Sequence, residues 1–208
     1  MGFYQLILYI EKAIALLLCF YVFEMTKAVA SAVQGDPTPK QQKMLTLNIF
    51  KYFEPIGFLL GFFFGYGWGQ PAPTAPRYYK NRKTGVFITF TAPIFVSLLL
   101  AVAFHGLGML TGKVFENASN TVTVYVYLFL TSVSDTFVRL AIFNLIPIPP
   151  MCGSEIIKCF LTPNQAFKYG QNAPIFQMVF LMLWFFGLIT PYLDIAVSVV
   201  EKVLFAMF

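Results

Sequence analysis

The chain has 208 residues, of which 58% are hydrophobic and only 11% are charged, and its formal net charge is +5. Soluble domains carry about a quarter charged residues, so this composition excludes an ordinary soluble protein. It predicts a polytopic membrane protein with a single domain, residues 1–208. The basic residues lie in loops beside apolar spans, which suits anionic lipid headgroups and does not indicate nucleic-acid binding.

The first predicted element is a long apolar helix, residues 3–32, which exceeds the about 20 residues needed to cross a membrane. It lacks a basic N-terminal region and a cleavage site, so we interpret it as a retained helix. Glu24 and Lys27 lie in its last third. Ionisable residues at membrane depth are functional candidates. These two also stand three apart on one helical face, where they can form a structural ion pair.

A polar segment, residues 34–54, comes next, followed by an apolar run, residues 56–68, that glycines interrupt. An apolar run of about 10–14 residues is more often re-entrant or interfacial than spanning. We therefore expect a re-entrant segment here. The loop 70–83 is rich in proline and ends in basic residues.

Two further crossings are predicted over residues 85–110 and 122–144. The first carries the only histidine, His105, which we interpret as a structural residue near the helix end. The second carries Asp135 and Arg139, two intramembrane charges four residues apart that can pair along the helix.

The C-terminal part predicts a fourth crossing of marginal length, residues 174–189. Pro191 is expected to end it, because proline cannot continue a helix. Residues 192–208 either return through the membrane or lie along its surface. The expected fold is therefore an all-α polytopic membrane protein with four to six helices and a re-entrant segment.

A proline-rich stretch, residues 144–154 (NLIPIPPMCGS), follows the third crossing. Three prolines in four positions make the backbone irregular at or just inside the membrane boundary. Such backbone survives in a membrane only when it is packed in protein or lines a wet cavity. A plain helix stop is the other interpretation. The positions that define this loop are Asn144, Pro147, Pro149, Pro150 and Gly153.

The orientation of the chain in the membrane can be predicted if residues 56–68 are re-entrant. The loops 34–83 and 151–173 then share one side and hold most of the basic residues, so the positive-inside rule makes that side cytoplasmic. The same topology brings Glu24 and Lys27 to the level of residues 144–153. If residues 56–68 crossed instead, the charges would divide almost evenly and the rule would say little.

The proline-rich stretch resembles the NLLPIPPLDGS segment of site-2 protease-type intramembrane zinc metalloproteases. Other pieces of the sequence match motifs of the same family in the same order: GDPT at 35–38, LTLN at 45–48, EPIG at 54–57, GWGQPAP at 67–73, Pro76-Arg77 and Ala92-Pro93. The resemblance covers about residues 19–163. It implies a site-2 protease-like transmembrane core.

In that family two histidines of HExxH and an aspartate hold zinc, and the glutamate is the general base. The matching window in this chain is Phe23-Glu24-Met25-Thr26-Lys27. Phe23 and Lys27 stand at the two histidine positions, and Cys152 stands at the aspartate. The resemblance thus implies that zinc is expected for the family but that its ligands are lost. Only Glu24 is retained, as a vestigial general base, and we expect no metal and no cofactor.

Three functions remain open from the sequence. The first is an inactive pseudoprotease that works by binding, with the lipid bilayer and another membrane protein or transmembrane segment as partners. We expect it as an integral multi-pass protein of a bacterial-type plasma membrane, with its site near the cytoplasmic side. The second is an active intramembrane metallopeptidase that uses Glu24 and Cys152. The third is a carrier that uses the intramembrane charges, although the chain shows no repeated halves.

Overall fold

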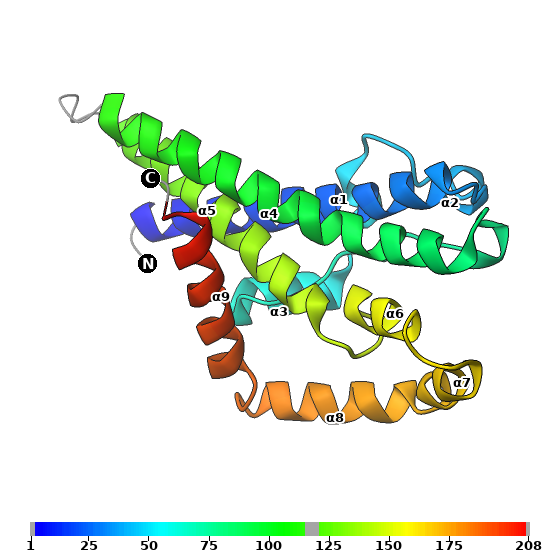
Figure 1. Ribbon diagram of the computed structural model, residues 1–208. Helices are drawn as coiled ribbons and strands as arrows, with labels where there is room; N and C mark the ends of the chain where they lie inside the picture. Colours follow the sequence, from blue (N-terminus) through cyan, green and yellow to red (C-terminus); the bar gives the residue numbers. More distant parts are fainter. Residues whose placement is uncertain (1–2, 115–120, 207–208) are drawn as a thin grey trace.

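The computed structural model describes residues 3–114 and 121–206, and these residues form helices with no strand. Figure 1 shows the arrangement. The α-helices are α1 (Phe3–Val33), α2 (Thr38–Gln41), α3 (Pro55–Phe64), α4 (Arg82–Val114), α5 (Thr121–Leu145), α6 (Cys152–Lys158), α7 (Pro163–Gln171), α8 (Ala173–Phe185) and α9 (Thr190–Leu204). Two short 3-10 helices are η1 (Ile49–Tyr52) and η2 (Pro76–Tyr78). The all-α prediction is confirmed.

The long helices α1, α4 and α5 pack together as a bundle (Figure 1). Each is apolar and long enough to cross a membrane, so the chain is an integral multi-pass membrane protein. Its core is built from aromatic and small side chains, including Phe23 and Phe137. The Ser134 hydroxyl of α5 donates a hydrogen bond to the Ala101 carbonyl of α4 (2.8 Å). Polar contacts of this kind tie spanning helices together where water is absent.

The segment around α3 leaves the bundle end and returns to it. The helix has 10 residues, or about 15 Å, which is too short to cross a hydrocarbon core. The Gln70 amide donates to the Tyr52 carbonyl (2.8 Å), so the two ends of the excursion lie together. That residues 56–68 are re-entrant in the membrane stays a prediction, and a short helix whose flanking segments meet is compatible with it.

Glycines allow this excursion to fold back tightly on itself. A Cβ placed on Gly57 would lie 2.1 Å from the Trp68 carbonyl oxygen, and one on Gly67 would lie 2.1 Å from the Gly57 carbonyl oxygen. Any side chain there would push the helix and the returning segment apart. The glycines that interrupt the apolar run in the sequence therefore allow α3 and the segment that follows it to pack together.

The fourth predicted element, residues 174–189, corresponds to the single helix α8 and the turn that follows it. After this turn α9 begins, and α8 and α9 meet at an angle of 86°, as in a broken span or a re-entrant loop. Gly187 has a left-handed φ of +71° at this turn. Pro191 does not end a helix but lies in the first turn of α9, where its missing N–H is no loss. Helix α8 has 13 residues, or about 20 Å, which is too short to cross a hydrocarbon core of about 30 Å by itself.

The pair α8–α9 forms an arm that begins away from the bundle and returns to it (Figure 1). Helix α9 packs on α5, and its Leu193 and Val197 are buried in the main apolar core. Within the described residues, three helices qualify singly as spans, and up to four qualify if the bent pair counts as one. This is the lower end of the four to six helices expected.

The two loops expected to share one side do lie at one end of the bundle. The Lys80 amide donates to the Gln34 carbonyl (3.2 Å), and the Cys159 thiol donates to the Lys83 carbonyl (3.7 Å). The chain around the start of α4 thus contacts both the residues that follow α1 and those that follow α6.

The close backbone contact at Gly57 leads to a stability test. We expect Gly57→Ala to lower the free energy of unfolding by at least about 1–3 kcal/mol, because the added methyl group meets backbone atoms that cannot rotate away. Thermal unfolding of the purified chain in detergent measures the effect. Gly170→Ala is the matched control, since nothing lies within 4 Å of that position. Equal melting temperatures for the two variants would contradict the packing described here.

Candidate functional site

A buried ion pair lies on the face of α1 that packs into the protein. The Lys27 ammonium nitrogen is 2.5 Å from Glu24 Oε2, and each side chain is 6% exposed. The same carboxylate oxygen accepts a hydrogen bond from the Ala72 amide (2.8 Å). Glu24 is therefore compensated by one full charge and by one backbone donor from the segment that returns from α3.

Cys152 lies near this pair, at the start of α6, and is 2% exposed. Burial raises the pKa of its thiol to about 12; the Lys27 ammonium opposes this rise and the Glu24 carboxylate adds to it. The thiol is thus within electrostatic reach of both charges and stays protonated at neutral pH. Phe23, on the preceding position of α1, is buried in the main apolar core.

The loop that carries Cys152 starts from the last turn of α5. Asn144 is buried there and donates its side-chain amide to the Leu140 carbonyl (3.0 Å). The Pro147 carbonyl accepts a hydrogen bond from the Tyr169 hydroxyl of α7. The proline-rich stretch therefore begins within α5, and its middle is held by α7.

The rest of the loop is a tight turn that includes a cis peptide bond between Pro149 and Pro150. The Met151 amide donates to the Ile148 carbonyl (3.0 Å). A Cβ on Gly153 would lie 2.2 Å from the Leu145 carbonyl oxygen. Glycine is needed here because α6 starts directly against the backbone at the end of α5. This contact sets the position of Cys152, and the packed-loop interpretation replaces that of a plain helix stop.

Asp36 connects the end of α1 to the returning segment. Its carboxylate accepts hydrogen bonds from the Ser31 hydroxyl (2.7 Å), the Thr38 amide (2.9 Å) and the Ala75 amide (2.6 Å). Burial acts to raise the pKa of Asp36, but these hydrogen bonds lower it below its ordinary value. Sequence reasoning identified GDPT only as a motif and did not predict this structural role.

Tyr52 was also missed as part of the site. It is 1% exposed, and its hydroxyl lies 3.4 Å from the Met25 sulfur and donates to the Met44 carbonyl. Burial, followed by the Glu24 carboxylate, raises the pKa of Tyr52 to about 12. No pattern in the segment 34–54 singled this tyrosine out in the sequence.

The predicted intramembrane pair of Asp135 and Arg139 forms, and it is part of a larger cluster. Arg139 Nε donates to both Asp135 oxygens (2.9 Å each). Its Nη1 donates to Asp194 of α9 (2.7 Å) and to the Tyr66 hydroxyl (3.2 Å). Arg139 therefore joins α5, α9 and the segment after α3. Among the residues described, no hydrogen bond or ion pair links this cluster to Glu24.

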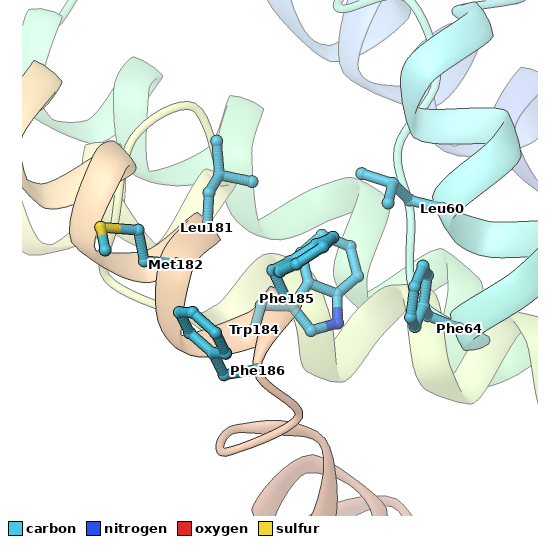
Figure 2. A pocket seen from close by; sticks show the side chains of 7 residues that line it. All are labelled: Leu60, Phe64, Leu181, Met182, Trp184, Phe185 and Phe186. Atoms are coloured by element: carbon cyan, nitrogen blue, oxygen red, sulfur yellow. The ribbon is translucent and has the colours of Figure 1, made fainter.

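Two apolar cavities lie between the arm and the rest of the protein. One, of about 410 Å³, is lined by Leu60 and Phe64 of α3, by Leu181, Met182, Trp184 and Phe185 of α8, and by Phe186 just after it (Figure 2). A second, of about 210 Å³, is lined by Trp68, by Pro149, Pro150 and Met151 of the proline-rich loop, and by α8. Leu181 lines both cavities. An apolar groove thus begins beside the loop that carries Cys152.

The residues present do not fit a hydrolytic zinc ion. Such a site needs three protein ligands with lone pairs, and within the described part of the chain no group of three or more His, Cys, Asp or Glu side chains could hold a metal. Phe23 has no donor atom, and Lys27 is bound to Glu24. His105 stacks on the Phe205 ring, with the ring centroids 3.8 Å apart.

Comparison with curated proteins identifies a relative in Bacillus subtilis (strain 168). It is named "Putative zinc metalloprotease YwhC" and is 30% identical over 190 residues, which cover 88% of this chain and 83% of that protein. The chain belongs to the same family as YwhC. This relationship is consistent with the resemblance to site-2 protease-type enzymes. No family model matches the chain, and no solved structure matches it.

The Glu24–Lys27 pair leads to a second prediction. We expect Lys27→Met to destabilise the protein by about 3–5 kcal/mol, because it leaves a buried carboxylate without its countercharge. The double variant Glu24→Gln/Lys27→Met removes both charges and should recover most of that loss. Thermal unfolding of the single and double variants measures the coupling. Strictly additive effects would contradict a direct buried pair.

Proposed function

We propose that this chain is a catalytically inactive, site-2 protease-like pseudoprotease that acts by binding a membrane partner or transmembrane segment. The observation that carries the proposal is the 2.5 Å ion pair between Lys27 and Glu24. Glu24 stands where the family has its general base, which must take a proton from a metal-bound water. Here one of its oxygens is bound to an ammonium group and a backbone amide.

The residues at the family's zinc-ligand positions support the same conclusion. At the three family ligand positions this chain has Phe23, Lys27 and Cys152. A phenyl ring offers no lone pair, and an ammonium group repels a divalent cation. We infer that the positive charge of Lys27 takes the place of the metal's charge beside Glu24. This would explain why Glu24 is retained although the hydrolytic reaction has been lost.

The groove supports a binding role. The cavities beside the proline-rich loop are lined almost entirely by apolar side chains, and such surfaces suit the apolar side chains of a transmembrane segment. We propose that the partner lies there, in a bacterial-type plasma membrane. The positive-inside rule would put the vestigial site near the cytoplasmic side, because the basic loops share its end of the bundle.

The alternative is an active intramembrane metallopeptidase with a non-standard site. Two observations favour it: the name of the B. subtilis relative, and the nearness of the Cys152 thiol to Glu24. A thiolate and a carboxylate would supply two zinc ligands, which is fewer than the three of known catalytic sites.

Metal analysis and a cleavage assay separate the two functions. We expect the purified chain to hold far less than one zinc per molecule and to leave a synthetic membrane-spanning peptide uncut. Phe23→His/Lys27→His/Cys152→Asp, which rebuilds the family's ligand set, should gain zinc. Stoichiometric zinc that is lost in Cys152→Ser, or cleavage that Glu24→Gln abolishes, would overturn the pseudoprotease proposal.

Peptide binding tests the groove directly. We expect Leu181→Trp to weaken binding of a fluorescent membrane-spanning peptide about tenfold, or ~1.4 kcal/mol, because the larger ring would obstruct the place where the two cavities adjoin. Fluorescence transfer in detergent micelles measures the affinity. Leu183→Trp is the matched control, since Leu183 lies on the same helix with similar exposure and lines neither cavity. Equal affinities for the two variants would contradict the proposed binding site.

A further inference from the structure

The start of α4 carries basic side chains with no acidic partner. Lys80, Arg82 and Lys83 are exposed, and no carboxylate in the described part of the chain forms an ion pair with any of them. The acidic residue on neighbouring α6, Glu155, is paired with Lys158 at 2.5 Å. The patch therefore keeps an uncompensated positive charge.

An exposed aromatic surface lies directly beside these charges. Phe87 of α4 is 40% exposed and Phe160, just after α6, is 70% exposed. Their rings meet edge to face with centroids 6.2 Å apart, and the Lys83 ammonium lies 5.9 Å from the Phe160 ring centroid. The contact between the Cys159 thiol and the Lys83 carbonyl (3.7 Å) holds the two segments together.

Charge and apolar surface follow a defined order along α4. The helix is a membrane-spanning candidate that begins at Arg82. Phe87 lies four residues beyond Lys83, which is about 6 Å deeper along the helix axis. A phospholipid has the same order, with a charged phosphate at the surface and acyl chains beneath it. Basic side chains at a membrane surface attract anionic lipids in particular.

We propose that the first turns of α4, together with Phe160, bind an anionic phospholipid. Its phosphate contacts Arg82 and Lys83, and an acyl chain lies on Phe87 and Phe160. The charge complementarity selects an anion, and the aromatic pair selects a lipid over free inorganic phosphate, which has nothing to place there. This site is separate from the groove beside Cys152 and does not depend on the proposed function.

Titration of the full chain with lipid, followed by native mass spectrometry, tests the proposal. The probes are palmitoyl-oleoyl phosphatidylglycerol and phosphatidylcholine, added separately to the protein in neutral detergent. We expect one phosphatidylglycerol to bind at least about fivefold more tightly than phosphatidylcholine. The preference should disappear in Arg82→Gln/Lys83→Gln. Phe160→Ala should weaken lipid binding of both kinds.

Lys113→Gln is the matched control, because Lys113 is an exposed lysine at the other end of the same helix. It should keep the wild-type preference. An equal loss in Lys113→Gln, or an unchanged preference in Arg82→Gln/Lys83→Gln, would overturn the site. Displacement of phosphatidylglycerol by an equal concentration of sodium phosphate would assign the patch to a free anion instead. Unchanged melting temperatures confirm that each variant is folded.

Discussion

The buried ion pair between Glu24 and Lys27 is the constraint on which the centre of this protein depends. A single buried charge in a membrane helix is costly, and two opposite charges at 2.5 Å largely cancel that cost. The pair also determines what can lie next to it. The Ala72 amide points at the carboxylate, so the segment that returns from α3 must pass close to α1.

That requirement explains much of the surrounding architecture. The returning segment reaches Glu24 only because Gly57 and Gly67 let two stretches of backbone touch, and because Asp36 accepts the Ala75 amide (2.6 Å) at its far end. On the opposite side, Gly153 lets the proline-rich loop fold onto the end of α5. The result is a closely packed pocket wall in which the polar groups satisfy one another.

The family relationship and the site chemistry point in different directions, and the proposed function reconciles them. Kinship with a protein named as a putative zinc metalloprotease would predict a metal-binding site. A pocket whose carboxylate is bound to an ammonium group lacks the open coordination position that hydrolysis needs. The proposed binding role is compatible with both observations, because it needs the scaffold and does not need the metal. The Arg139 cluster keeps the α8–α9 arm on the bundle, beside the apolar groove.

The sequence by itself determined the membrane class, the three long spans and the short apolar helix between the first two of them, because hydropathy and helix length are local properties. It also determined that Glu24 could meet Lys27, and Asp135 could meet Arg139, since both pairs follow helical spacing. Only the tertiary structure decided that Ala72 completes the Glu24 site, that Asp194 joins Arg139, and that α8 and α9 meet at 86°. These features depend on contacts between segments far apart in the chain, and no local pattern encodes them.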